Sequence, residues 1–239
     1  MPYFFCETKL NPSKIVNLAA QETRHLLLSH RARVGETVKL QGPDKKRFLA
    51  EILRIGKGVV ELKCLQELSV PSEPLVGLVL FQAVIAEKAL DFILQKGTEL
   101  GLEKIVLFNA KNSATKLSKE KFAAKQERWQ KILIEAAKQS ERAVWPEIFF
   151  VSSADELESQ FAGLEIVYLT DINGGRPSQI TGNGKIGIIV GPEGGFKDEE
   201  IAIFTKQLNV QALGLGSVLL RAETAAIAAL AGIRMINGF

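Results

Sequence analysis

The sequence contains little of what metal centres and disulfide frameworks are built from. Its 239 residues include only two cysteines, Cys6 and Cys64, and two histidines, His25 and His30. The cysteines do not form a Cys-x-x-Cys pair, and with the histidines they do not form a set with the spacing of zinc ligands. We therefore expect no disulfide framework and no bound metal.

Long apolar runs are missing as well. No segment approaches the roughly 20 apolar residues of a bilayer-spanning helix, and residues 1–10 lack a basic stretch followed by an apolar one. We therefore expect a cytoplasmic protein that does not interact with membranes. The sequence also lacks internal repeats and low-complexity segments, and its 46% hydrophobic and 24% charged residues are typical of a globular chain.

An excess of one sign of charge is nearly absent from the chain as a whole, whose formal net charge is +3, but the charges are unevenly distributed. Residues 1–72 carry 12 basic and 7 acidic side chains, whereas the remaining residues carry 18 and 20. Because phosphate contacts supply most sequence-independent affinity for nucleic acid, this division suggests a binding module attached to a separate working domain. A solvated basic surface is the alternative.

The pattern of strands also changes near residue 72. Short strands are expected at 38–40, 48–55 and 59–64, with turns between them, which indicates a small β-rich module. Pro71 and Pro74 then interrupt regular structure, because proline lacks a backbone donor and restricts the residue before it. We place the boundary between two domains, 1–72 and 73–239, at this point.

The second domain alternates apolar runs with amphipathic stretches, which predicts an α/β fold. Helices are expected at 87–101, at a Ser153–Glu156 capping box and at 222–237. The expected strands are 75–83, 105–108, 147–151, 165–170, 185–190 and 211–215. Continuous apolar strands separated by helices indicate a mostly parallel sheet covered on both faces, with ligands bound beyond its carboxyl ends.

The last predicted helix, 222–237, has almost no polar face. Alanine, isoleucine and leucine occupy most of its positions between residues 225 and 233. A helix that is apolar all round is expected to be buried on all sides, either inside its domain or against another subunit.

A Gly-x-Gly-x-x-Gly pattern at 182–187 invites a dinucleotide-binding interpretation, but its context does not fit. The pattern precedes the apolar run 186–190, whereas a dinucleotide fingerprint follows a strand and opens a helix. We assign it to the turn that leads into a strand.

The stretch from Gly191 to Phe196 is a more specific candidate, because it joins a buried strand to a helix. Glycines at 191, 194 and 195 permit close backbone approach, Pro192 stiffens the turn, and the acidic residues 198–200 suit the first turn of a helix. A cofactor could lie against exposed backbone here. A tight turn without a ligand is the alternative.

A second candidate loop runs from Leu215 to Arg221. Arg221, Glu223 and Thr224 are the only strongly polar side chains between an apolar strand and an apolar helix. Charged groups at such a place are expected to be paired or functional, because unpaired buried charge is costly. The structural alternative is an ion pair of Arg221 with Glu223 or Glu193.

Residues 111–131 form a second basic segment, expected to belong to a helix that continues to Arg142. One face of this helix would join the core and the other could meet phosphates, or simply be solvated. Its basic residues are Lys111, Lys116, Lys119, Lys121, Lys125, Arg128 and Lys131.

Together, the stretches 191–196 and 215–225 resemble the signature of the RsmE family. These are uridine-N3 methyltransferases of small-subunit ribosomal RNA in the SPOUT superfamily. The resemblance extends to 96–101, to 135–140 with Arg142, and to His25 with Arg31, so it covers nearly the whole chain. Two places depart from the family pattern, Lys111-Asn112-Ser113 and Ser29-His30.

The resemblance implies a fold and an activity. The fold is a PUA-like RNA-binding β-barrel at 1–72 and a SPOUT methyltransferase domain at 73–239, with a mostly parallel sheet and a C-terminal trefoil knot. The activity is methylation of N3 of a specific uridine in 16S rRNA within the small ribosomal subunit, by a homodimer that uses S-adenosylmethionine (SAM). The alternatives are a SPOUT methyltransferase acting on a ribose 2′-hydroxyl or on tRNA, and an RNA-binding ribosome-assembly factor without catalysis.

The resemblance and the loop positions also give candidate residues. We expect Arg221, Glu193 and Glu223 to be catalytic: Arg221 stabilises charge on the uracil carbonyls or anchors a phosphate, and a glutamate orders it or accepts the N3 proton. The expected cofactor residues are Leu169, Thr170, Asp171, Gly191, Pro192, Glu193, Gly194, Gly195, Leu215, Gly216, Ser217, Leu220 and Arg221. The expected RNA-binding residues are Arg24, Arg31, Arg33, Lys111, Asn112, Lys116 and Arg142.

Overall fold

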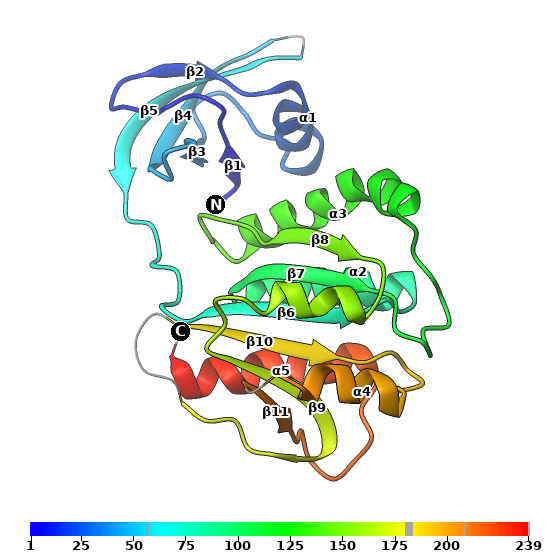
Figure 1. Cartoon of the computed structure of the whole chain (residues 1–239). Coiled ribbons are helices and arrows are strands. Elements are labelled where there is room, and N and C mark those ends of the chain that lie inside the picture. Colours follow the sequence, from blue (N-terminus) through cyan, green and yellow to red (C-terminus); the bar gives the residue numbers. More distant parts are fainter. Residues whose placement is uncertain (57, 180–183, 208, 239) are drawn as a thin grey trace. The chain divides into compact units, whose positions relative to one another are not determined.

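A computed structural model describes residues 1–56, 58–179, 184–207 and 209–238 (Figure 1). The chain divides into two compact units. The first comprises Met1–Ser72 together with Lys138–Val144, and the second comprises Glu73–Ala137 together with Trp145–Phe239. The first unit is therefore discontinuous in sequence.

The first unit is a curled five-stranded sheet with one helix (Figure 1). Its strand order is β1-β3-β4-β5-β2, in which β1 lies parallel to β3 and the other neighbours are antiparallel. Alternate side chains point inward and form a core that includes Phe4, Leu40, Phe48 and Leu62. The sheet is a half-barrel with β1 and β2 at its edges. Its elements are β1 (Tyr3–Phe5), β2 (Ile15–Asn17), α1 (Ala20–Ser29), β3 (Thr37–Gln41), β4 (Arg47–Ile55) and β5 (Val60–Leu68).

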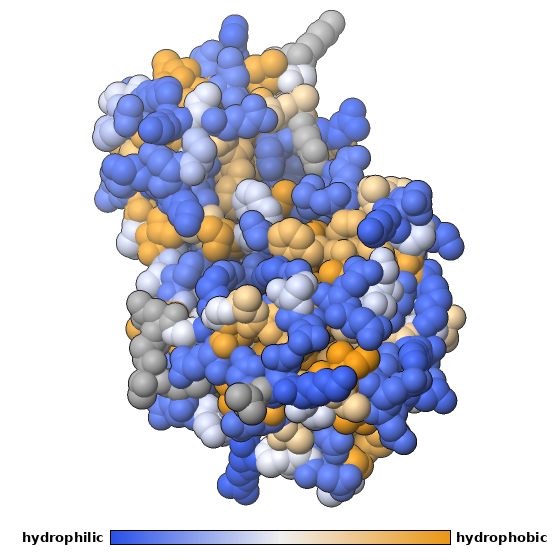
Figure 2. All heavy atoms as spheres, in the orientation of Figure 1, coloured by the Kyte–Doolittle hydropathy of each residue, from blue (hydrophilic) through white to orange (hydrophobic). Residues whose placement is uncertain are grey.

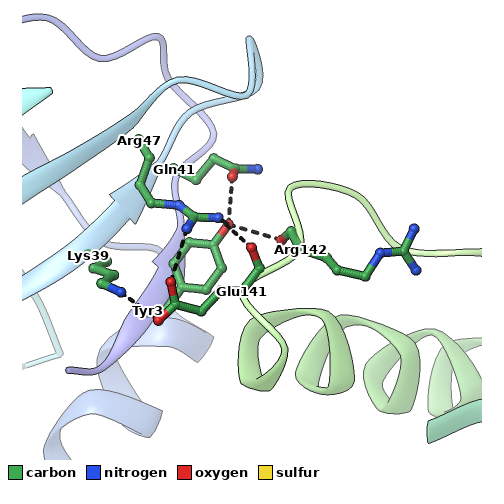
Figure 3. Close-up of polar contacts among 6 residues, drawn as sticks. All are labelled: Tyr3, Lys39, Gln41, Arg47, Glu141 and Arg142. Atoms are coloured by element: carbon green, nitrogen blue, oxygen red, sulfur yellow. Dashed lines mark hydrogen bonds and ion pairs between the residues drawn. The ribbon is translucent and has the colours of Figure 1, made fainter. Parts of the chain in front are cut away.

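The segment Lys138–Val144 is held to this sheet by a buried polar cluster (Figure 3). Arg47 is only 1% exposed, and its guanidinium donates to the backbone carbonyl of Glu141 at 2.9 Å and to the Tyr3 hydroxyl at 3.1 Å. The Glu141 carboxylate lies 2.5 Å from Lys39 Nζ and 3.4 Å from Arg47 Nη1. The hydrogen bond from Lys39 holds the pKa of Glu141 below its ordinary value.

Gln41 completes the cluster from strand β3. Its side-chain amide donates to the carbonyl of Ala143 at 2.8 Å, and its oxygen accepts a 2.6 Å bond from the Tyr3 hydroxyl. Glu141 has a φ of 57°, a left-handed conformation that a residue other than glycine rarely adopts. The two cations that face its carboxylate give a reason for a glutamate at this position.

The second unit is an α/β structure built on a six-stranded parallel sheet, as the sequence predicts. The strand order is β11-β9-β10-β6-β7-β8. Its elements are β6 (Gly77–Ala83), α2 (Glu87–Glu99), β7 (Leu102–Phe108), α3 (Lys119–Gln139), β8 (Glu147–Val151), η1 (Asp155–Gln160), β9 (Ile166–Gly175), β10 (Lys185–Val190), α4 (Asp198–Thr205), β11 (Val210–Leu213) and α5 (Ala222–Asn237).

Two apolar cores cover the two faces of this sheet. Strand β6 shows the division: Leu78 and Leu80 join a core with α2, α3 and α5, whereas Val79 and Phe81 join another core with η1 and α4. Strands buried on both faces read as continuous apolar runs, which is why the sequence identifies them. Figure 1 shows the helices arranged about the sheet in this way.

Of the two expected forms of burial for helix α5, complete burial inside its own domain is not observed. Its buried positions, among them Ala226, Leu230 and Ile233, lie on the face packed against the core. Met235 is 75% exposed and Ile236 is 38% exposed. The buried face also carries Arg234, which donates to the backbone carbonyls of Val76 at 2.7 Å, Leu100 at 3.3 Å and Gly101 at 3.1 Å.

Two local predictions are wrong. The expected Ser153–Glu156 capping box does not form: the segment is a 3-10 helix whose first flanking residue is Ala154, and the Glu156 carboxylate accepts from the backbone of Ser152 instead. The basic helix begins at Lys119 rather than at 111, because residues 109–118 form a loop of their own.

The Gly-x-Gly-x-x-Gly pattern leads into strand β10, whose first residue is Lys185. Its residues Gly182 and Asn183 lie outside the described part of the chain. Among the described residues, no helix is long and apolar enough to cross a membrane. On the face drawn in Figure 2, hydrophobic residues form small patches separated by hydrophilic ones.

Candidate functional site

A cavity of about 470 Å³ opens in the second unit, beyond the carboxyl ends of strands β9, β10 and β11. Three chain segments form its walls: the end of β9, the loop between β10 and α4, and the loop between β11 and α5. Its lining includes the expected cofactor residues Leu169, Thr170, Asp171, Gly191, Pro192, Glu193, Gly195, Leu215, Gly216, Leu220 and Arg221. The expected residues Gly194 and Ser217 lie in these loops but outside the lining.

The first wall exists because strand β9 bulges away from β11. The pairing steps from Ala212 opposite Leu169 directly to Leu213 opposite Gly175, which leaves residues 170–174 without partners on β11. Thr170 still bonds the carbonyl of Ile189 at 3.1 Å. The bulged residues therefore turn toward the cavity.

Two glycines allow the backbone after this bulge to pass close to the backbone after strand β11. A Cβ atom on Gly214 would lie 2.2 Å from the carbonyl oxygen of Gly174, and one on Gly174 would lie 2.3 Å from the carbonyl carbon of Leu213. No side chain fits at either position without moving backbone. The loop between β11 and α5, which forms another wall of the cavity, therefore starts at a fixed point.

The loop after β10 is anchored by its aromatic residue. The Phe196 ring packs against Phe204 and Phe108, with centroids 5.2 and 6.2 Å away, in the core under α4. Gly195 donates to the carbonyl of Pro192 at 2.9 Å and closes the turn. Glu193, between these anchors, is exposed and lines the cavity.

Arg221 also lines the cavity, at the N-cap of helix α5. Its side chain is exposed, so the expectation of a buried charge there is wrong. Within the part of the chain that the structure describes, Arg221 forms no ion pair with Glu193 or Glu223, which were the structural alternatives. A cation beside a helix N-terminus opposes the helix dipole, so helix stability does not explain this arginine.

Glu223 is placed differently from Glu193. It lies in the first turn of α5, is half-buried, and does not belong to the lining of the cavity. An acidic residue at this position stabilises a helix through its dipole. Of the two expected acidic catalytic residues, the structure brings Glu193 but not Glu223 to the cavity with Arg221.

Three residues expected to bind RNA belong to the loop 109–118 and make contacts within the second unit. Asn112 donates to the carbonyls of Gly194 and Gly195, at 3.0 and 3.2 Å. Lys111 forms an ion pair with Glu199, and Lys116 donates to the carbonyls of Ala110 and Lys111. No sequence pattern indicates that this loop contacts the loop 191–196.

Much of the basic face of α3 is neutralised by α2. Arg128 donates to Asp91 at 2.8 and 2.9 Å and also pairs with Glu87, which receives a further bond from Lys125. The Asp91 bond raises the pKa of Arg128, and the Lys125 bond lowers the pKa of Glu87. This arrangement supports the solvated, ion-paired face over a phosphate-binding one.

The other expected RNA-binding residues belong to the first unit. Arg24, on α1, and Arg31 and Arg33, in the loop after it, are all exposed. Arg31 has a φ of 49°, again in the left-handed region. Arg142 lies in the segment Lys138–Val144, and Figure 3 shows its guanidinium pointing away from the cluster around Glu141.

Most lining residues outside the expected cofactor set are apolar. Val190 and Ile201 belong to runs that the sequence marks only as core, whereas Phe196, Ala222 and Ala225 belong to the family-like stretches 191–196 and 215–225. The remaining ones lie in the bulge or the last loop and are exposed: Ile172, Asn173, Val218 and Leu219. Among the described residues, no group of three or more His, Cys, Asp or Glu is placed to hold a metal ion.

Known proteins are similar to this chain over most of its length. Residues 71–234 match the model of a family described as an RNA methyltransferase domain. The ribosomal RNA small subunit methyltransferase E of Mesomycoplasma hyopneumoniae is 32% identical over 177 residues, which cover 74% of this chain and 77% of that protein. The protein of the same name from Bacillus subtilis is 28% identical, covering 97% of this chain and 94% of its own.

Solved structures agree over nearly the whole chain. Ribosomal RNA small subunit methyltransferase E from Neisseria gonorrhoeae, bound to S-adenosyl methionine, superposes with a TM-score of 0.88 at 28% identity. A protein from Legionella pneumophila, described as a methyltransferase with the bound cofactor SAM, gives 0.89 at 29% identity. Each alignment covers 99% of this chain and 98% of the other.

Proposed function

Because this chain belongs to the ribosomal RNA small subunit methyltransferase E family, we propose that it transfers a methyl group from SAM to N3 of a uridine in 16S rRNA. The single observation that carries the proposal is the cavity where the loops 191–196 and 215–221 meet, since both family-like stretches line it. The class of RNA follows from the names of the relatives. The choice of N3 follows from the family that the sequence resembles.

The residues of the cavity suit this cofactor. Glycine-rich loops expose backbone donors and acceptors, and Leu169, Leu215 and Leu220 provide apolar surface for an adenine ring. When bound, SAM supplies an electrophilic methyl group. We assign its binding to Leu169, Thr170, Asp171, Gly191, Pro192, Glu193, Gly195, Leu215, Gly216, Leu220 and Arg221, with Gly194 and Ser217 supporting the loops.

Uracil N3 carries a proton and is a poor nucleophile at neutral pH. The enzyme must hold the base in line with the methyl group and promote loss of that proton. Arg221 stabilises the negative charge that develops on the uracil carbonyls, or anchors a neighbouring phosphate. Glu193 accepts the proton, because it lines the same cavity as Arg221, and Glu223 contributes through helix α5.

The first unit serves as the RNA-binding module of this proposal, with a PUA-like role for 1–72 and a SPOUT role for 73–239. Arg24, Arg31 and Arg33 are exposed cations suited to phosphates, and we include Arg142 with them. Of the loop 109–118, Lys111 and Lys116 remain candidates for RNA contact. Methylation at N3 requires an unpaired or extruded base, so we expect an accessible uridine in a folded small subunit.

We further propose that the enzyme is a homodimer that acts in the cytoplasm, where ribosomal subunits are assembled. The support for dimerisation is the apolar side of α5 that the chain leaves uncovered, including Met235 and Ile236.

The testing experiment incubates the purified protein with radiolabelled SAM and small ribosomal subunits from cells lacking this activity, followed by nucleoside analysis. We expect label in 3-methyluridine of the small-subunit RNA. Label in a 2′-O-methylated nucleoside or in tRNA would move the target to another SPOUT substrate. Absence of SAM binding would contradict catalysis and support an assembly factor.

A further inference from the structure

Two loops that lie far apart in the sequence are tied together beside the cavity. One is 109–118, between β7 and α3, and the other is 191–197, between β10 and α4. Asn112 and Gly194, which join them, are 82 residues apart. Only the second loop lines the cavity.

The loop 109–118 is held in shape by its own side chains. Asn109 bridges it, because its amide donates to the carbonyl of Leu117 at 2.8 Å and its oxygen accepts from the Leu117 backbone at 2.9 Å. Lys116 donates to two carbonyls inside the loop, including that of Lys111 at 3.1 Å. The loop is therefore a firm support for whatever it contacts.

The loop 191–197 has few such restraints. Its glycines at 191, 194 and 195 lower the cost of changing backbone conformation. Between Gly191 and Phe196, its internal support among the described residues is one turn bond, from the Gly195 amide to the Pro192 carbonyl. The packing of Phe196 against Phe204 and Phe108 anchors one point of the loop, and hydrogen bonds from outside must then define the backbone geometry of the rest.

Asn112 and Glu200 supply those contacts. The Asn112 amide group donates to the carbonyls of Gly194 and Gly195, at 3.0 and 3.2 Å. The Glu200 carboxylate, 1% exposed, accepts from the Lys111 backbone at 2.8 Å with one oxygen and from the Lys197 backbone at 3.0 Å with the other. A buried carboxylate with two amide donors fixes the loop end firmly, since bonds to a charged acceptor are strong.

We propose that Asn112 and Glu200 are positioning residues that hold the loop 191–197 in the conformation that binds SAM. This inference rests on the proposed function and deepens it. A loop held in its bound conformation loses less entropy on binding, so each tie increases affinity without touching the ligand. Neither residue lines the cavity, and neither is assigned a chemical step.

The experiment is calorimetric titration of the full-length protein with SAM, comparing the wild type with Asn112→Ala, Asn112→Asp and Glu200→Gln. We expect the Kd to rise by about tenfold or more in Asn112→Asp and Glu200→Gln, with a stoichiometry that stays near one site per chain. Asn112→Asp should raise the Kd more than Asn112→Ala does, because the introduced carboxylate faces two carbonyl oxygens. In Glu200→Gln, an amide group faces a backbone donor.

Glu199→Gln is the matched control, because Glu199 adjoins Glu200 but is 62% exposed and pairs with the exposed Lys111 side chain. Its Kd should equal that of the wild type. A merely structural role for Asn112 or Glu200 would lower the fraction of binding-competent protein and leave the Kd unchanged. In methyl transfer, the KM for SAM should rise in the variants more than the KM for RNA.

Unchanged Kd values in the Asn112 and Glu200 variants, with a wild type that binds SAM, would overturn this inference and leave the proposed function standing. A wild type that does not bind SAM would overturn the proposed function and this inference with it.

Discussion

At the scale of single residues, Arg221 is the side chain whose placement is hardest to explain by stability. It is exposed at the cavity and lies at a helix N-terminus, where a cation is unfavourable. If it stabilises charge in the transition state, Arg221→Ala should lower kcat about 100-fold. Steady-state kinetics on small subunits would measure this, and Arg54→Ala, an exposed arginine of the first unit, is the control. Near-normal turnover of Arg221→Ala would refute the assignment.

Substitutions at Glu193 and Glu223 distinguish a role in catalysis from a role in helix stability. Glu193→Gln should lower kcat by about tenfold or more with little change in melting temperature, because its exposed side chain lines the cavity. Glu223→Gln should instead reduce stability by about 0.5 kcal/mol through the helix dipole and retain most activity. Measuring kcat and thermal unfolding for both variants tests this, and the reverse pattern would make Glu223 the proton acceptor.

The sequence predicts the polar residues of the site better than its walls. Glycine, proline and charged side chains between apolar runs mark the two loops, because such residues have few structural reasons to stand there. Val190 and Ile201 give no such signal, since an apolar residue beside a ligand looks like one in a core. Asn112 could be singled out only by resemblance, and its contact with Gly194 follows from tertiary structure alone.

At the scale of elements, Arg234 links helix α5 to two other places in the second unit. These are the residue before strand β6 and the end of helix α2. This fully buried guanidinium satisfies the carbonyls of Val76, Leu100 and Gly101. Arg234→Met should destabilise the protein by about 3 kcal/mol, because it leaves buried carbonyls without donors. Chemical denaturation would measure the loss. As the control, Leu75→Ala, at a 75% exposed position next to Val76, should stay within about 0.5 kcal/mol of the wild type, and equal losses would contradict the argument.

Glu141, in the segment Lys138–Val144, should make the free energy of unfolding depend on pH. The pKa of Glu141 is lowered in the folded protein, so its contribution is present above the ordinary value near 4.5 and is lost as pH falls through the folded pKa. The difference in unfolding free energy between the wild type and Glu141→Gln should therefore shrink from pH 7 to pH 3. Urea denaturation at both values tests this.

The control for Glu141 is Glu67→Gln, which removes a half-exposed pair with Lys46. This substitution should change the unfolding free energy by less than Glu141→Gln does at pH 7. A Glu141→Gln difference that grows on acidification would show that the carboxylate does not act through Lys39 and Arg47.

The sequence predicts the positions of elements best where the hydrophobic pattern extends over several residues. Strands β8 and β10 and helix α5 begin and end at the expected residues. The three-residue strands β1 and β2 are too short to show a period, and β1 exists through its pairing with β3. The left-handed turn at Glu141, where a glycine would be usual, likewise depends on cations that come from distant strands. The knot implied by the family resemblance stays a prediction.

At the scale of the whole molecule, the proposed dimer depends on the uncovered apolar side of α5. Met235→Glu should shift the protein from dimer to monomer, because a charge would be buried in the contact. Light scattering measures the mass directly. Leu28→Glu, on helix α1 and 74% exposed, introduces the same charge elsewhere and should leave the mass unchanged. A wild type that is already monomeric would contradict the dimer.

The discontinuous first unit has a consequence for how the protein is made. Residues 1–72 leave the ribosome early, yet Arg47, Gln41 and Tyr3 receive their partners only when 138–144 have been synthesised. Until then, a buried guanidinium has neither its carboxylate nor its carbonyl, so the nascent half-barrel is incomplete. Folding of the N-terminal module is therefore timed by translation of the segment between its two parts, which contains β6, α2, β7 and most of α3, rather than by its own emergence.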